Sequence, residues 1–306
     1  MNKVSGVHGV FMLRPNNFGF NNDTKNSNPW QNNVKFDQKY IASKALSEFD
    51  EMVEVLTSHQ IKVHILKDSL SEKLPDAIFL NNWFTITPEN DLFLFPLAYE
   101  SRRGERRFEL IEQIQDALNI QNTYDLSHFE KEQIFLESTG SIVFDYEYKR
   151  AYASISDRTN EKLFDSFCAK IDYKGFVFNC FDLKGLPIYH TNVLLSIASA
   201  YAIVCLDTIE SNLEKAFMKK LLEQSEKVVI DISIHQMLSF SGNCLEVYDN
   251  NGKSKLVISR TGYSALKEEQ IEIIEKYSEF IVVNVSIIER VGGGSARCMM
   301  MGVPTF

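Results

Sequence analysis

Residues 213–237 read LEKAFMKKLLEQSEKVVIDISIHQM, and residues 266–290 read LKEEQIEIIEKYSEFIVVNVSIIER. The two stretches align without a gap, each residue matching the one 53 positions later, and most apolar positions correspond. Each stretch opens with the apolar spacing of an amphipathic helix and closes with a run rich in β-branched residues. The alignment therefore predicts a repeated helix–strand unit. Its identical pairs are Leu213/Leu266, Ser225/Ser278, Glu226/Glu279, Val229/Val282, Ser233/Ser286 and Ile234/Ile287.

The same order of helix and strand recurs along the whole chain at intervals of roughly 50 to 60 residues, which is a period typical of repeat architectures. Five such units predict an α/β protein with pseudo-fivefold repetition. The helical patterns begin near Ser43, Gly104, Asn160, Ser211 and Tyr263, and the β-rich runs that follow them span residues 61–66, 123–126, 176–181, 228–232 and 280–285.

One polar residue in each unit stands just before an apolar run. These residues are Asn82, Glu137, His190, Asn243 and Cys298, at successive spacings of 55, 53, 53 and 55. A fivefold repeat closed into a ring brings equivalent positions together at its axis, so the period predicts that the five side chains converge. They are the residue types of a nucleophile, a base, an orienting carboxylate and two polar binders.

Composition excludes several classes of function. The 306 residues carry 41 acidic and 32 basic side chains, a formal net charge of -9, and 44% hydrophobic residues. A sizeable core can therefore be buried, in one large domain or two. The acidic balance argues against sequence-independent binding to nucleic acid and against docking on an anionic membrane.

The cysteines and the apolar segments point to the cytoplasm. Five cysteines, an odd number, lie far apart without a C-x-x-C pair, which excludes a zinc ribbon and disfavours a disulfide scaffold. The most apolar stretch, residues 193–206, is interrupted by Ser196 and Ser199 and is shorter than a bilayer requires. No signal-peptide core follows Met1. We therefore expect a cytoplasmic protein. No metal-ligand spacing such as H-E-x-x-H occurs.

Seven motifs, spread over nearly the whole chain, lead to a known family. In this order and on this period they resemble the pentein superfamily, which includes arginine deiminases, dimethylarginine dimethylaminohydrolases, succinylarginine dihydrolases and amidinotransferases. The chain looks most similar to the amidinotransferase-like citrulline-utilisation hydrolases. The motifs are MLRPNNFGFN (12–21), PDAIFLNNWF (75–84), SRRGER (101–106), LESTGS (136–141), SDRTN (156–160), YHTN (189–192) and GGGSARCM (292–299).

The resemblance implies a fold and a class of ligand. The expected fold is a single domain, residues 1–306, built as a five-bladed α/β propeller of ββαβ modules with the site at its centre. The expected ligand is a small amino acid, and neither a metal nor another cofactor is implied. Exposed helix faces leave room for a homodimer, although the sequence identifies no interface.

The catalytic residues are expected to be Cys298, His190 and Glu137. Cys298 would attack the central carbon of a guanidino or ureido group, and the Gly292–Gly294 run would let the backbone approach the substrate. His190 would protonate the leaving nitrogen and then activate water, while Glu137 fixes its tautomer. A small buried hydrophobe is the ordinary alternative for Cys298. The other four cysteines are read as structural.

Substrate contacts follow from the resemblance residue by residue. Arginines matching Arg102 and Arg158 hold the substrate carboxylate in relatives, and Asp76 matches an aspartate that contacts the bound amino acid. Relatives of the dimethylargininase type carry Glu-Asp where this chain has Asn81-Asn82. Two amides cannot neutralise a guanidinium but can hydrogen-bond a neutral ureido group, which favours citrulline over arginine. Succinylarginine dihydrolases have asparagine there too and still take a guanidino group.

Two features remain open. The Asn-rich segment 16–33 is a candidate lid, with a plain surface loop as the alternative. The function is either a hydrolase of citrulline or an arginine-type amino acid, or an amidinotransferase that uses the same covalent intermediate. A non-catalytic binder of this fold is the third reading, and the presence of Cys298, His190 and Glu137 together argues against it.

Overall fold

The computed structural model describes residues 6–68 and 74–305. Within these ranges the strands form five three-stranded sheets. In every sheet the middle strand pairs antiparallel with one neighbour and parallel with the other. The five sheets therefore share one ββαβ plan, since a parallel neighbour needs a crossover connection. The chain has a mixed α/β fold of small sheets.

Four of the sheets are contiguous in sequence, and the fifth joins the two ends of the described chain. That fifth sheet has the order β15 (Met301–Thr305), β1 (Gly6–Leu13) and β2 (Val63–Leu66). The contiguous sheets are β3 (Phe84–Ile86), β4 (Leu92–Leu94), β5 (Thr123–Asp125); β6 (Val143–Asp145), β7 (Arg150–Ser154), β8 (Lys174–Phe178); β9 (Leu195–Ile197), β10 (Tyr201–Val204), β11 (Val228–Asp231); and β12 (Leu245–Tyr248), β13 (Ser254–Ser259), β14 (Glu279–Val283).

Helices provide the crossovers and the short turns around the site. The crossover helices are α1 (Gln38–Ser58), α3 (Phe108–Ala117), α5 (Glu161–Lys170), α6 (Asn212–Gln224), α8 (Arg260–Ala265) and α9 (Glu268–Glu275). The remaining helices are α2 (Glu100–Arg103), α4 (Ser138–Ser141), α7 (Ile234–Leu238), α10 (Ser286–Gly292), and the 3-10 turns η1 (Leu80–Asn82), η2 (Ser127–Glu132), η3 (Thr191–Val193), η4 (Leu206–Thr208) and η5 (Ala296–Met299).

All five predicted β-rich runs are strands, namely β2, β5, β8, β11 and β14, with ends shifted by a few residues. Asn160 and Ser211, where helices were predicted to begin, cap α5 and α6 through their side chains. The helix predicted to begin near Gly104 is α3, which begins at Phe108, and the short helix α2 ahead of it carries the buried Arg102. The helical pattern predicted to begin near Tyr263 is divided between α8 and α9.

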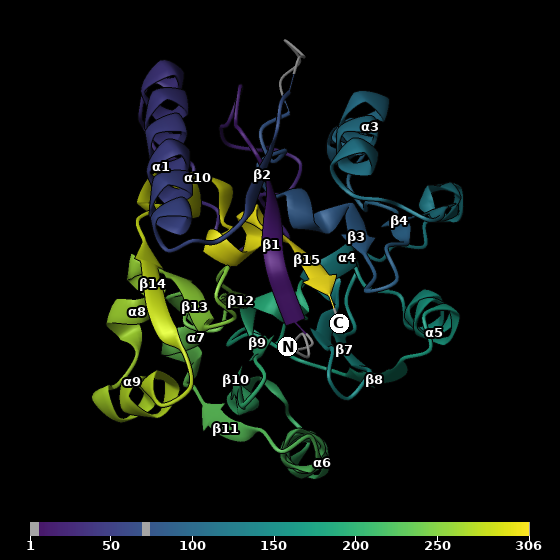
Figure 1. Cartoon of the computed structure of the whole chain (residues 1–306), viewed down its shortest axis with the longest axis vertical. Coiled ribbons are helices and arrows are strands. Elements are labelled where there is room, and N and C mark those ends of the chain that lie inside the picture. Colours follow the sequence, from purple (N-terminus) through teal and green to yellow (C-terminus); the bar gives the residue numbers. More distant parts are fainter. Residues whose placement is uncertain (1–5, 69–73, 306) are drawn as a thin grey trace.

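The sheets lie around a common centre, and the longer helices lie outside them (Figure 1). Neighbouring sheets touch through their inner strands: β15 contacts β3, β6 contacts β9, β9 contacts β12, and β12 contacts β1. Helix α1 covers its sheet with a buried stripe, Ile41, Ala45, Phe49, Met52 and Leu56, at helical spacing. Burial of such apolar side chains holds the longer helices on the outer side of the sheets. The ends of the strands nearest the centre are left to form the site.

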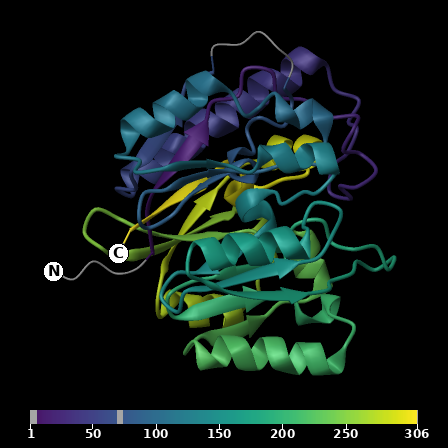
Figure 2. The ribbon, with the colours of Figure 1, turned by 90° about the vertical axis from the view of Figure 1, so that its right-hand side faces the viewer.

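The edge-on view separates two sides of the molecule. In Figure 2 the C-terminal end of β15 lies at the left, and the purple loop that follows β1 lies at the right. Across residues 6–68 and 74–305, no helix combines the length and the apolar character that crossing a bilayer demands.

Candidate active site

Each of the five periodic polar residues lies just before the first strand of a different sheet. Asn82 ends η1 ahead of β3, Glu137 precedes α4 and β6, and His190 precedes η3 and β9. Asn243 precedes β12, and Cys298 lies in η5 ahead of β15. All five side chains are buried. The predicted convergence is found, since these residues contact one another or line one cavity.

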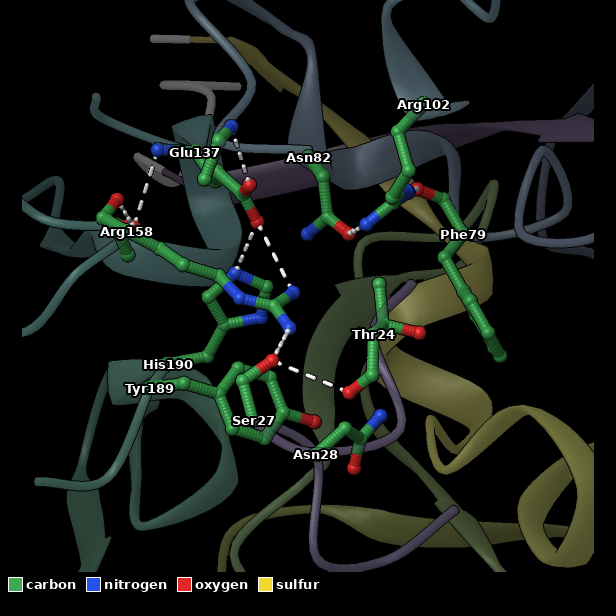
Figure 3. Close-up of polar contacts among 12 residues, drawn as sticks. Thr24, Ser27, Asn28, Phe79, Asn82, Arg102, Glu137, Arg158, Tyr189 and His190 are labelled. Carbon is green, nitrogen blue, oxygen red and sulfur yellow. Dashed lines mark hydrogen bonds and ion pairs between the residues drawn. The ribbon is translucent and has the colours of Figure 1, made fainter. Parts of the chain in front are cut away.

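Glu137 and His190 form a short hydrogen bond, with Nε2 of His190 2.7 Å from Oε2 of Glu137 (Figure 3). Although burial alone would raise it, the pKa of Glu137 is held well below its ordinary value by Arg158 and His190. Burial lowers the pKa of His190 to about 4, against the opposite effect of Glu137. The imidazole is therefore neutral at neutral pH. It donates from Nε2 to the carboxylate, which leaves Nδ1 as a free base.

Cys298 is held by two amide side chains. Asn243 Nδ2 lies 3.4 Å from the sulfur, and Asn192 Nδ2 lies 4.0 Å from it. The Cys298 amide also donates to the carbonyl of Ser295 at 3.0 Å. Burial raises the pKa of the Cys298 thiol, while hydrogen bonds with Ser295 and Asn243 and the nearby Arg297 and Arg102 act in the opposite direction.

Asn82 is fixed in one orientation by Arg102. Nη1 of Arg102 donates to Oδ1 of Asn82 at 2.7 Å, so the Asn82 amide presents its NH₂ group elsewhere, in part to Oδ1 of Asn81 at 3.1 Å. The Arg102 guanidinium also grips Glu105 through two bonds of 2.8 Å. Arg102 is thus engaged by the protein itself. Asp76 lies beside it, with Oδ1 buried and without a hydrogen-bond partner.

Arg158 joins the catalytic pair to the segment that follows β1. Its Nη1 lies 3.4 Å from Oε2 of Glu137, and its Nη2 donates to Oγ of Ser27 at 2.8 Å (Figure 3). The guanidinium is stacked between Tyr99 and Tyr189, at 4.8 and 4.5 Å from the ring centroids. Arg158 is therefore rigidly placed at the edge of the site.

The segment between β1 and α1 covers the centre. Asn21 donates to Oδ2 of Asp76 at 2.8 Å, and Asn28 donates to the carbonyls of Gly292 and Gly293. Gly293 has a left-handed φ of 67°, and a Cβ there would come within 2.6 Å of Asn28. The glycine therefore admits the covering segment.

The cavity beneath this segment is small. It measures about 20 Å³, which is space for about one water molecule. Its walls include Asp76, Asn82, Arg102, Arg158, His190 and Cys298, together with Thr24, Asn28 and the Gly292–Gly294 run. Six of the predicted residues thus share one small cavity.

The other predicted residues contact the site from behind. Glu137 and Asn243 touch His190 and Cys298, and Asn81 lies behind Asn82 with its Nδ2 buried and unpartnered. The sequence reasoning missed Asn192, although it belongs to the quoted motif at 189–192. It also missed Glu105, which stands three residues after Arg102, and the individual roles of Ser27 and Asn28.

Within the described ranges, no group of three or more His, Cys, Asp or Glu side chains is arranged to hold a metal ion. The five cysteines there are free and buried. Burial raises the pKa of Cys168, Cys180, Cys205 and Cys244 to about 12 each. Those four thiols are therefore unreactive near neutral pH.

A sequence family matches almost the whole chain. The family described as N,N dimethylarginine dimethylhydrolase, eukaryotic, matches residues 14–305. No curated protein matches the chain by sequence.

Solved structures of similar fold are enzymes of arginine chemistry. The N-terminal domain of ArgZ, an arginine dihydrolase from the ornithine–ammonia cycle in cyanobacteria, was solved as a cysteine-to-serine mutant bound to substrate. It has a TM-score of 0.75 at 14% identity, with 97% of this chain and 98% of that chain covered. AgrE, solved as a complex with L-arginine, has a TM-score of 0.76 at 15% identity, with 97% of this chain and 40% of that chain covered.

A dimethylarginine dimethylaminohydrolase, solved as an adduct with 4-chloro-2-hydroxymethylpyridine, has a TM-score of 0.67 at 16% identity. The match covers 97% of this chain and all of that chain. The chain also spans 40% of the length of full-length ArgZ.

Proposed function

The chain belongs to the N,N dimethylarginine dimethylhydrolase family, within the pentein superfamily, and from this premise we propose a cysteine-dependent hydrolase of citrulline or an arginine-type amino acid. The observation that carries the proposal is the neutral imidazole of His190, hydrogen-bonded to Glu137 and facing the same cavity as Cys298. A nucleophile and a base that line one cavity, with a carboxylate that orients the base from behind, are the components of covalent catalysis at a C–N bond.

The proposed reaction has two steps. The Cys298 thiolate forms a bond to the central carbon of the substrate, and the bond from that carbon to the leaving nitrogen breaks as the nitrogen takes a proton from protonated His190. Water then gives a proton to His190 and adds to the carbon, and the sulfur–carbon bond breaks. With citrulline, the first step releases ammonia and the second releases the carbamate of ornithine, whose C–N bond then breaks as the nitrogen takes the carbamic-acid proton, giving ornithine and carbon dioxide; one water is consumed.

The orientation of Asn82 favours a neutral ureido substrate. Because Asn82 Oδ1 accepts from Arg102, the amide can offer only N–H donors to a substrate. A ureido carbonyl oxygen accepts such donors, whereas a guanidinium has donors only. The cations Arg102 and Arg158 on the cavity wall add to the cost of a guanidinium. We therefore propose citrulline as the first substrate to test.

The remaining contacts would hold the amino-acid end of the substrate. Arg158 carries one weak contact to Glu137 and one bond to Ser27, so a carboxylate that replaced the Ser27 hydroxyl would gain a charged partner. Arg102 is already paired with Glu105, and we assign it to the orientation of Asn82. The unpartnered Oδ1 of Asp76 would accept from the substrate ammonium group.

Entry requires movement of the covering segment, because the cavity of about 20 Å³ cannot hold an amino acid. We propose that residues 14–37 open and close over the substrate. We also propose that the five sheets are the blades of one five-bladed α/β propeller in a single domain. The contacts between neighbouring sheets support this architecture.

The decisive experiment measures ammonia release from citrulline and from arginine in parallel, with Cys298→Ala as the control. Ammonia from citrulline that is absent in the variant would support the ureido hydrolase. Ammonia from arginine alone would exclude the ureido preference and keep the mechanism. If neither substrate reacts alone but one reacts when an amine acceptor is added, the protein is an amidinotransferase.

A further inference from the structure

A buried arginine directly precedes the proposed nucleophile. Arg297 and Cys298 are consecutive in η5, and only 9% of Arg297 and 5% of Cys298 are exposed. The guanidinium donates from Nη1 to the carbonyl of Met300 at 2.7 Å. In the part of the chain that the structure describes, no carboxylate lies in ion-pair contact with it. A buried charge without a counter-charge is costly and calls for a functional explanation.

The other buried arginines show the ordinary arrangement. Arg102 is paired with Glu105 at 2.8 Å, and Arg158 with Glu137 at 3.4 Å. Both guanidinium groups are also shielded from water. Arg297 therefore differs from them in lacking a partner, although it is buried to a similar extent.

Arg297 faces away from the substrate cavity. It lines a second cavity of about 50 Å³, whose walls include Val7 of β1 and Asn192. That volume holds a water or two, which can hydrate the far side of the guanidinium. Asn192 belongs to the wall of this cavity and also contacts the Cys298 sulfur. Asn192 therefore links the second cavity to Cys298, which lines the substrate cavity.

The other charged groups around Arg297 have partners of their own. Lys227 lies 3.6 Å from Asp145 and 3.3 Å from Glu147. Glu246 accepts from the amide and hydroxyl of Ser199 and from the hydroxyl of Ser254. Tyr146 and Cys244 face the guanidinium as neutral groups, since burial raises the pKa of each to about 12. The thiolate of Cys298 is the one anion that the proposed reaction would add beside Arg297.

We propose that Arg297 stabilises the thiolate of Cys298 electrostatically, from the side opposite the substrate cavity. Deprotonation leaves the electron pair of the S–H bond on the sulfur and passes the proton to His190. Arg297 then gains the counter-charge that it lacks in the resting protein. The attraction between the two groups acts against the burial that raises the pKa of the thiol.

This inference rests on the proposed role of Cys298 as nucleophile, and it explains how a neutral substrate can be attacked. A cationic guanidinium would itself stabilise a neighbouring thiolate, whereas a ureido group carries no charge to do so. A protein cation placed behind the sulfur supplies that charge in every catalytic cycle. Arg297 thus acts on the reaction through Cys298, as a positioning residue, and its charge suits substrates that carry none.

The test measures the rate of Cys298 alkylation by iodoacetamide against pH, read by mass spectrometry and without any substrate. It compares the wild type with Arg297→Met and Arg297→Lys. The matched control is Arg150→Met. Arg150 begins β7, and its half-buried guanidinium donates to the carbonyl of Leu221. The four other thiols stay unreactive because their pKa values are about 12.

The expected result is a thiol pKa that rises by about one unit in Arg297→Met, which slows alkylation about tenfold near neutral pH. Arg297→Lys and Arg150→Met should stay within about twofold of the wild type. Replacing an unpaired buried charge with an apolar side chain should also keep or raise the melting temperature.

Two results would overturn the proposal. The first is a folded Arg297→Met protein with the wild-type alkylation profile. The second is an Arg297→Met protein that unfolds or melts at a lower temperature, because the guanidinium would then be holding the fold. If the wild type releases ammonia from none of the substrates but Arg297→Met has a shifted alkylation profile, the result would count against the proposed function alone.

Discussion

The hydroxyl of Ser27 accepts a 2.8 Å hydrogen bond from Nη2 of Arg158, although 131 residues separate them in the chain. The bond closes the covering segment onto the arginine that we assign to the substrate carboxylate. Closure and substrate binding therefore compete for the same guanidinium.

Ser27→Ala should loosen the covering segment. A hydrogen bond to a charged group contributes about 1.5–3 kcal/mol, part of which water replaces, so the KM for the active substrate should fall several-fold. Trypsin should also cleave at Lys25 several-fold faster. Ser58→Ala, an exposed change on α1, is the control. Unchanged KM and unchanged cleavage at Lys25 would show that this bond does not hold the segment closed.

The pH dependence of stability should reveal the neutral state of His190. Its pKa falls from 6.5 to about 4 on folding, because burial disfavours the charged form. Between those values the unfolded chain binds more protons than the folded protein, so stability rises with pH across that window. His190 should thus contribute a fall in melting temperature as pH is lowered from 6.5 towards 4, while the buried Glu105, whose pKa burial raises to about 7, acts in the opposite direction.

In His190→Asn the melting temperature should depend less on pH between 6.5 and 4. The titration of Glu137 should not restore that dependence. Because folding lowers the pKa of Glu137, its ionised carboxylate stabilises the folded protein at neutral pH. That stability is lost only as the pH falls below the ordinary pKa of a glutamate. Thermal melts of both proteins in a series of buffers provide the measurement. Parallel slopes in the two proteins would mean that His190 is charged in the folded state.

Asn82→Asp should move the preference from ureido to guanidino substrates. The new carboxylate would still accept from Arg102, and it would present a negative oxygen where the wild type presents N–H donors. We expect the ratio of kcat/KM for arginine over citrulline to rise at least tenfold, which corresponds to about 1.4 kcal/mol. A ratio that stays constant while both rates fall would remove Asn82 from substrate selection.

Gly140→Ala should abolish activity without unfolding the protein. A Cβ at this position would lie 2.5 Å from Nδ2 of Asn82 and 2.9 Å from Cε1 of His190, so both groups must move. Small displacements in an active site cost about 100-fold in rate. Gly104→Ala is the control, because its Cβ would meet only the side chain of Leu74 at 3.3 Å. Wild-type kcat in Gly140→Ala would show that the two groups tolerate displacement.

The periodicity of the sequence predicted the part of the site that repeats. Glu137, His190 and Cys298 could be found because each occupies the same place in its own unit, and the strands were found because their apolar runs are dense. The short helix α2 and the buried ion pair of Arg102 with Glu105 could not be predicted, since the sequence shows two charged residues and not their burial.

Contacts between units were equally out of reach. Asn192 reaches the Cys298 sulfur and Ser27 reaches Arg158 only because the chain folds back on itself over more than 100 residues. The unpaired state of Arg297 could be recognised only from its surroundings, since the sequence gives an arginine beside a cysteine and no information on counter-charges.

The pairing of β1 with β15 has a consequence for how the protein could be divided. Each sheet contributes one of the five periodic residues, so a fragment that lacks any one sheet lacks part of the site. Two fragments cut in the Asp249–Lys253 turn, which joins β12 and β13 within one sheet, would each be inert. Catalysis would return only when the halves associate, which makes the site a reporter of reassembly from separate pieces.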